Sequence, residues 1–191
     1  MVPKLTFAPV TPFLDDGSLD VPGLERQITW LKGQGVESII AGGTTGEFPS
    51  LSMRERLEVL TTSRRAFGPV GYLFANVSAC AMDDVLDLTC QALESEAEPD
   101  ALLLLPPYYH KPFSAESGAA GIEAFFMAAL HKIGAEIEAR RATASAKRSP
   151  VVFLYTFALH TQQPIPPDVY GRLCTAFPTL LRGIKASFVG R

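Results

Sequence analysis

A lysine lies in the last apolar run of the sequence, where residues 183–187 read GIKAS. If a strand directs the Lys185 side chain into a protein interior, desolvation disfavours the charged ammonium and makes the neutral amine available as a nucleophile. A neutral amine attacks a ketone to form a Schiff base, whose iminium withdraws electrons from the adjacent carbon. A surface lysine following a strand has the same local pattern. The sequence at this point therefore predicts either a nucleophile or an ordinary surface residue.

A glycine-rich turn offers a second chemical feature, because residues 43–47 read GTTGE between an apolar run and a helical pattern. Such a turn exposes backbone N–H groups together with the hydroxyls of Thr44 and Thr45, which suits a carboxylate or a phosphate. The turn lacks both the Gly-Lys-Ser/Thr end of a P-loop and the Gly-x-Gly-x-x-Gly of a dinucleotide site. The alternative is a tight turn with no ligand.

Tyrosines follow two other apolar runs. Tyr155 ends the run that precedes the lysine segment. Neighbouring strands in a sheet lie about 5 Å apart, so this phenol could relay protons to and from an adduct on Lys185. A half-buried aromatic with a satisfied hydroxyl is the structural alternative. Tyr108 and Tyr109 follow residues 101–105, and either packing or an interface contact would explain them.

The elements that must position these residues alternate along the chain. Apolar runs predict strands, and longer periodic stretches predict helices. Six strands are expected at residues 5–10, 38–41, 70–76, 101–105, 151–155 and 181–185, with helices from a cap at Asp20 to Gly33, from a capping box at Ser52 and Glu55 to Ala66, and over 82–93, 122–140 and 167–176. Apolar strands separated by helices indicate a parallel sheet covered on both faces. A (β/α)8 barrel and an open doubly wound sheet both fit, and both place ligands where the strands end.

The composition bounds the class of protein. The chain has 191 residues, 47% hydrophobic and 19% charged, with a net charge of −3. We expect one soluble domain over residues 1–191, with no nucleic-acid partner because the chain is acidic, and no membrane span because no apolar run reaches about 20 residues. Three separated cysteines (Cys80, Cys90 and Cys174) and three histidines (His110, His131 and His160) lack disulfide or metal-ligand spacing. We predict no metal and no cofactor, and a reducing compartment, cytoplasmic with a mitochondrial location left open.

Taken in series, five segments resemble the dihydrodipicolinate synthase and N-acetylneuraminate lyase family. They read PVTPF at 9–13 with DGS at 16–18, GTTGE at 43–47, PYYHKP at 107–112, LY at 154–155 and GIK at 183–185, and they span essentially the whole chain. Residues 46–51 and 55–59, GEFPSL and ERLEV, also look like the 4-hydroxy-2-oxoglutarate aldolase branch.

This resemblance implies a (β/α)8 barrel and class I aldolase chemistry. Lys185 matches the lysine that forms a Schiff base with pyruvate or another 2-oxo acid. Thr44 and Thr45 match the turn that holds the substrate carboxylate, with Thr44 also in a hydroxyl relay. Tyr155 matches the proton-transfer tyrosine, and Tyr109 matches the tyrosine that reaches a neighbouring subunit's site in many members. The resemblance therefore also implies a homo-oligomer, a dimer or tetramer.

Two positions depart from the family's pattern. His160 stands where dihydrodipicolinate synthases carry an arginine that grips the carboxylate of the second substrate. A histidine is mostly neutral at pH 7 and lacks the guanidinium fork, which counts against the lysine-biosynthetic reaction. Ala186 replaces an acidic residue often found after the lysine.

The length also departs from the pattern, because a (β/α)8 barrel typically needs about 250 residues. We therefore expect an incomplete TIM barrel in which only about six βα units are present, with two unpaired strand edges. Two hypotheses follow. One is a Schiff-base aldolase or lyase whose full gene product is longer. The other is a truncated, catalytically inactive relative that acts as a binding or assembly module. A nucleotide-binding open sheet is a third interpretation and lacks a phosphate fingerprint.

Overall fold

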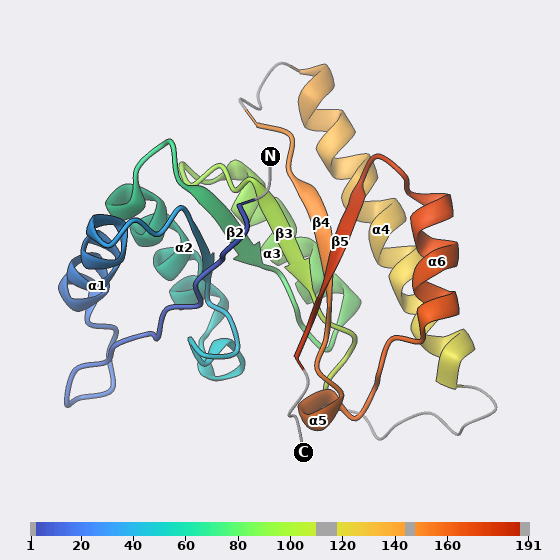
Figure 1. Ribbon diagram of the computed structural model, residues 1–191, viewed down its shortest axis with the longest axis horizontal. Coiled ribbons are helices and arrows are strands. Elements are labelled where there is room, and N and C mark those ends of the chain that lie inside the picture. Colours follow the sequence, from blue (N-terminus) through green and yellow to red (C-terminus); the bar gives the residue numbers. More distant parts are fainter. Residues whose placement is uncertain (1–2, 110–117, 144–147, 188–191) are drawn as a thin grey trace. The chain divides into compact units, whose positions relative to one another are not determined.

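The computed structural model describes residues 3–109, 118–143 and 148–187 (Figure 1). It divides into two compact units, which are described separately below. Unit 1 comprises Met1–Asn76 and Cys90–Ala101, and unit 2 comprises Val77–Thr89 and Leu102–Arg191. The prediction of a single domain over 1–191 stays a prediction.

Helices and strands alternate along the described chain. The elements are α1 (Val21–Gly33), β1 (Ser38–Ala41), the 3-10 helix η1 (Phe48–Ser50), α2 (Met53–Phe67), β2 (Tyr72–Asn76), α3 (Met82–Glu94), β3 (Ala101–Leu104), α4 (Gly118–Ala142), β4 (Val151–Thr156), α5 (Ala158–Thr161), α6 (Pro167–Ala176) and β5 (Leu181–Ala186). The strand order is β1-β2-β3-β4-β5, and the pairs β1/β2 and β4/β5 are parallel. This order follows the chain, as in a barrel, whereas a doubly wound sheet reverses its order at a switch point. The α/β barrel prediction is confirmed over the described strands.

The strand predicted over residues 5–10 is wrong in extent. The structure reduces it to one parallel bridge between Phe7 and Ile39, in which Phe7 N donates to Ser38 O at 2.8 Å and Ile40 N donates to Phe7 O at 2.8 Å. Pro9 lacks the N–H that a longer ladder would require, so the pairing ends early. The short helices η1 and α5 were not predicted.

Helix starts follow the capping signals in the sequence. The Asp20 carboxylate accepts a hydrogen bond from Gly23 N at the start of α1. At the start of α2, Ser52 Oγ accepts from Glu55 N at 3.3 Å and Ser52 N donates to Glu55 Oε2 at 2.8 Å, which confirms the predicted capping box. Ser52 Oγ also donates to Glu55 Oε2 at 2.6 Å, and this bond, together with the one from Ser52 N, lowers the pKa of the Glu55 carboxyl.

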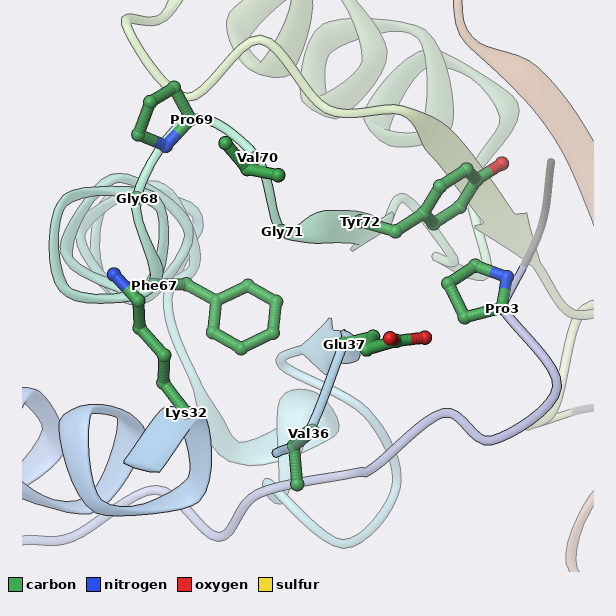
Figure 2. A pocket seen from close by; sticks show the side chains of 10 residues that line it. All are labelled: Pro3, Lys32, Val36, Glu37, Phe67, Gly68, Pro69, Val70, Gly71 and Tyr72. Carbon is green, nitrogen blue, oxygen red and sulfur yellow. The ribbon is translucent and has the colours of Figure 1, made fainter. Parts of the chain in front are cut away.

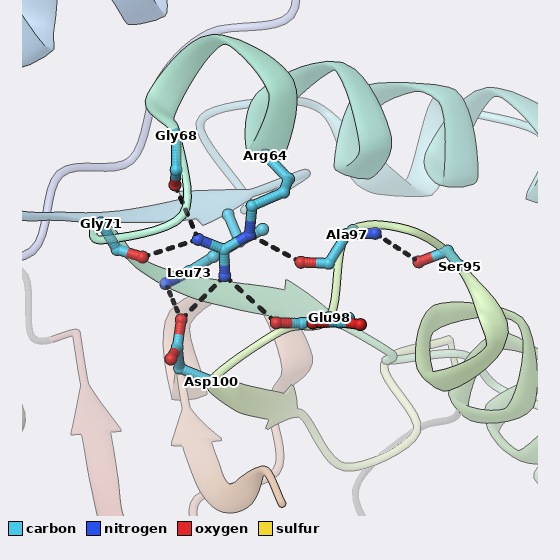
Figure 3. A network of polar contacts seen from close by, with 8 residues as sticks. All are labelled: Arg64, Gly68, Gly71, Leu73, Ser95, Ala97, Glu98 and Asp100. Atoms are coloured by element: carbon cyan, nitrogen blue, oxygen red, sulfur yellow. Dashed lines mark hydrogen bonds and ion pairs between the residues drawn. The ribbon is translucent and has the colours of Figure 1, made fainter. Parts of the chain in front are cut away.

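A buried arginine connects two loops of unit 1 (Figure 3). Arg64, on α2, has a side chain that is 9% exposed. Its guanidinium donates to backbone oxygens of four residues in two loops, namely Gly68, Gly71, Ala97 and Glu98, and to the Asp100 carboxylate. Asp100 Oδ2 also accepts from Leu73 N at 2.9 Å, at the start of β2. The α2–β2 and α3–β3 loops are therefore tied to one side chain.

In unit 2, α4 and α6 lie side by side (Figure 1). Their buried faces include Leu130 and Ile133 on α4 and Leu173 on α6, all at 0% exposure. At the surface, Arg172 donates from two nitrogens to both oxygens of Glu123, each at 2.8 Å. This hydrogen bonding lowers the pKa of the Glu123 carboxyl. Unlike the fully buried β1 and β3, β5 is buried only at Leu181 and half-buried or exposed beyond it.

Candidate active site

The predicted lysine and tyrosine lie on adjacent strands of unit 2. Tyr155 is the fifth residue of β4, Lys185 is the fifth residue of β5, and the two are paired in register. In-register residues of neighbouring strands point to the same face of a sheet. The Lys185 Nζ accordingly lies 3.4 Å from the centroid of the Tyr155 ring. An ammonium in this position is attracted by the negative face of the ring.

A serine completes this group. Lys185 Nζ donates to Ser187 Oγ at 3.0 Å, and the Tyr155 hydroxyl lies 3.1 Å from the same Oγ. Ser187 N donates to Thr156 O at 3.0 Å, which continues the β4/β5 pairing one residue beyond β5. Ser187 was not predicted as a site residue. The signal was available, because residues i and i+2 of a strand share a face.

The surroundings of Tyr155 fix its ring. Tyr155 is 2% exposed, and its ring stacks on Phe157 with the centroids 5.8 Å apart and the planes at 17°. Lys185 is half-buried. On the same strand, a Cβ built on Gly183 would lie 2.5 Å from the Phe153 ring. Glycine at this position therefore lets Phe153 cover β5 two residues before the lysine.

The threonine turn belongs to unit 1 and directly follows β1. Thr44 is half-buried and Thr45 is exposed. Gly46 O accepts from Thr11 Oγ1 at 2.7 Å, and a Cβ on Gly46 would lie 3.1 Å from both Pro9 O and that same Oγ1. The close approach favours glycine, and residues 9–11 pack against the turn. The backbone that carries Thr44 and Thr45 is therefore held in place by residues 9–11.

Two other predicted residues lie after β3 and β4. Tyr109 is 86% exposed on this chain. His160 lies in α5, and its side chain falls outside the part of the chain that the structure describes. The segment that follows α5 is hydrogen-bonded to the segment that carries Tyr109, because Gln163 Nε2 donates to Pro107 O at 2.7 Å. Both segments therefore follow strand ends on the side where barrel sites form.

Two pockets lie away from these residues, at the ends where strands begin. One of about 410 Å³ in unit 1 surrounds the Phe67 ring, with Lys32 and Glu37 at its sides (Figure 2). The other, of about 420 Å³ in unit 2, lies where β4 and β5 begin beside α4. Barrel ligands bind at the opposite ends of the strands, so neither pocket is the candidate site.

Within residues 3–109, 118–143 and 148–187, His, Cys, Asp and Glu side chains form no group of three or more suited to a metal ion. Across these ranges, every helix is too short or too polar to span a bilayer. The three cysteines, Cys80, Cys90 and Cys174, are half-buried thiols.

The fold and the site define a class: parallel α/β barrel proteins with a lysine and a tyrosine at the carboxyl ends of neighbouring strands. Comparison with known families agrees with that class. The model of the dihydrodipicolinate synthetase family matches residues 1–132. The chain belongs to this family.

Similar proteins carry related names. The chain is 41% identical over 103 residues to 4-hydroxy-tetrahydrodipicolinate synthase of Teredinibacter turnerae, covering 54% of this chain and 35% of the relative. It is 30% identical over 170 residues to the Prochlorococcus marinus protein of that name, covering 89% of this chain and 49% of the relative. The chain therefore spans about half, or less, of the curated relatives it matches.

Solved structures show the same fold. Dihydrodipicolinate synthase from Agrobacterium tumefaciens superimposes with a TM-score of 0.78 at 28% identity, covering 95% of this chain and 57% of that one. The chloride-inhibited synthase from Acinetobacter baumannii, complexed with pyruvate, gives 0.74 at 28% identity, covering 95% and 54%. The 2-keto 3-deoxygluconate aldolase from Picrophilus torridus, at 21% identity and a TM-score of 0.77, covering 95% and 57%, supports the fold alone.

Proposed function

We propose that this protein acts as a class I aldolase or lyase, with Lys185 forming a Schiff base with pyruvate or a related 2-oxo acid. The observation that carries the proposal is the position of Lys185 Nζ, 3.4 Å from the Tyr155 ring centroid and 3.0 Å from Ser187 Oγ at the carboxyl ends of β4 and β5. Family membership supports it, as does the pyruvate complex of the Acinetobacter baumannii relative.

The chemistry needs one amine and a proton relay. The neutral amine of Lys185 adds its lone pair to the keto carbon, and the carbonyl π electrons move to oxygen, which takes up the proton that nitrogen loses. The C–O bond then breaks as that oxygen accepts a second proton and leaves as water, while the nitrogen lone pair forms the C=N bond of an iminium. Tyr155 is the proposed donor of the second proton.

The iminium next accepts the electron pair of a neighbouring bond. If that bond is C–H, a proton leaves and an enamine forms. If it is C–C next to an alcohol carbon, an aldehyde leaves as its hydroxyl loses a proton, and the same enamine remains. Protonation of the enamine carbon and hydrolysis release the 2-oxo acid and restore the amine. Each step uses water and protons alone.

The substrate carboxylate is assigned to the threonine turn. Thr44 and Thr45 supply hydroxyls, and the held backbone of residues 43–46 supplies N–H groups, since Glu47 N already donates to Thr44 O at 3.0 Å. Thr44 also takes part in the hydroxyl relay. The 86% exposure of Tyr109 supports a role in a neighbouring subunit's site, and hence a homo-oligomer, dimeric or tetrameric.

The second substrate is the aldehyde partner. With His160 in place of an arginine, we favour cleavage of 4-hydroxy-2-oxoglutarate over condensation with aspartate semialdehyde. Both reactions are assayed on the same preparation, the first by pyruvate release. His160→Arg is expected to raise the condensation and leave the cleavage at or below its starting rate. Condensation by the unsubstituted protein at a rate above cleavage would reverse this preference.

The shared first half of the reaction is tested without knowing the aldehyde. Pyruvate in D₂O is followed by proton NMR, because enamine formation exchanges its methyl protons for deuterium. The protein is expected to accelerate exchange and Lys185→Met to abolish the acceleration. Exchange no faster than in buffer would favour the inactive binding or assembly module.

A further inference from the structure

Three polar atoms of unit 2 form a continuous chain. Lys185 Nζ, Ser187 Oγ and the Tyr155 hydroxyl are linked by contacts of 3.0 and 3.1 Å. Ser187 is held in place by its backbone N–H, which donates to Thr156 O at 3.0 Å. The serine hydroxyl thus sits between the proposed nucleophile and the proposed proton donor.

The geometry allows the Ser187 hydroxyl to connect the Lys185 amine with the Tyr155 phenol oxygen. Nζ contacts the face of the Tyr155 ring near its centroid, whereas the phenol oxygen lies at the ring edge. A serine hydroxyl has one donor and two acceptor sites, so it can accept from Nζ and donate to the phenol oxygen at the same time. The Tyr155 proton is then directed to a further acceptor.

We infer that Ser187 is the proton-relay residue between Lys185 and Tyr155 during Schiff-base formation. The inference rests on the proposed function and adds a residue to it. As nitrogen bonds to the keto carbon, it passes one proton to Ser187 Oγ, and Ser187 passes its own hydroxyl proton to the Tyr155 oxygen. Tyr155 passes its proton to the former carbonyl oxygen. Each hydroxyl gains and loses one proton, so neither changes charge.

The test measures how fast the Schiff base forms. Pyruvate is mixed with the full chain, the reaction is quenched with borohydride at set times, and the reduced adduct is quantified by mass spectrometry. Ser187→Ala is expected to slow adduct formation about 100-fold, the scale of a lost proton-transfer group. Ser187→Thr keeps a hydroxyl and should restore most of the rate. Thr175→Ala removes an exposed hydroxyl on α6 and serves as the matched control.

A relay is distinguished from a structural role by chemical rescue and by pH. Added imidazole buffer should raise the rate of Ser187→Ala in proportion to its concentration, and the pH profile of that variant should differ from that of the unsubstituted chain. If Ser187→Ala does not fold by circular dichroism, Ser187→Cys takes its place, since a thiol is only a weak donor.

The results of this test distinguish a failure of the Ser187 relay from a failure of the proposed Schiff-base function. If the unsubstituted chain forms no adduct, both fail. If it forms the adduct and Ser187→Ala or Ser187→Cys forms it at the same rate with the same pH profile, the relay is overturned and the Schiff base stands. A slow variant that imidazole does not rescue would also overturn the relay, because that result indicates a structural role.

Discussion

Replacing Arg64 by methionine should severely destabilise unit 1. The Arg64 side chain is almost completely buried, at 9% exposure, and the side chain of its partner Asp100 is 15% exposed. In Arg64→Met, the Asp100 carboxylate keeps the Leu73 N–H and loses its charged donor. The variant also removes the guanidinium donors from carbonyls in the α2–β2 and α3–β3 loops.

The size of the loss in unfolding free energy follows from the carboxylate that remains in the variant without its charged partner. Removing one partner of a buried ion pair costs about 3–5 kcal/mol, because the other charge stays desolvated and uncompensated. With a urea dependence of about 2 kcal/mol/M, a loss of about 4 kcal/mol lowers the unfolding midpoint by about 2 M. Arg64→Met/Asp100→Asn should recover part of this loss, because the uncompensated charge is removed as well.

The assay is equilibrium urea unfolding followed by circular dichroism. Arg65→Met is the matched control, since Arg65 is the next residue of α2, is 56% exposed and pairs with Glu25 at the surface. An exposed pair contributes about 0–1 kcal/mol, so this variant should unfold near the original midpoint. Equal midpoints for Arg64→Met and Arg65→Met would show that the Arg64–Asp100 pair contributes no more to stability than an exposed pair.

Three further predictions concern stability. Ser52→Ala removes the cap of α2 and should cost about 1 kcal/mol, measured by thermal unfolding. Gln162 has φ +54°, so Gln162→Val should lower the thermal midpoint and Gln162→Gly should not; the reverse order would contradict a left-handed residue there. The pKa of Glu123 is lowered by Arg172, so its stabilisation is present above the unfolded-state value of about 4.3 and lost as pH falls through the folded value. Glu123→Gln should therefore lower the midpoint at pH 7 and converge with the unsubstituted chain in acid, and a gap independent of pH would exclude the ion pair.

Local patterns in the sequence predicted most of the helices and strands, and the hydrogen bonds of the structure explain why. The capping box at Ser52 placed the start of α2, and Pro167 to Ala176 matches α6. These boundaries depend on hydrogen bonds between residues three or four apart, which sequence spacing reveals. The strand predicted over residues 5–10 was too long because the apolar pattern was given more weight than Pro9, which has no N–H to donate to a neighbouring strand.

The buried hydrogen-bond network around Arg64 could not be predicted from the sequence. Arg64 lies on a helix where a charged residue normally faces water, and its acceptor Ala97 O is 33 residues away. Lys185 and Tyr155 were predicted as neighbours because parallel strands align their carboxyl ends, and unit 2 brings them together. Ser187 was missed, although its position two residues after the lysine marks the same face. The roles of all six predicted site residues remain predictions: Lys185, Tyr155, Thr44, Thr45, Tyr109 and His160.

The central claim is that the Lys185 amine captures a 2-oxo acid. The most direct measurement is peptide mapping by mass spectrometry after borohydride reduction in the presence of saturating pyruvate. A reduced pyruvate adduct is expected on Lys185, with none on the exposed Lys132 of α4 and none on the chain carrying Lys185→Arg. An unmodified Lys185, or modification spread equally over surface lysines, would contradict it.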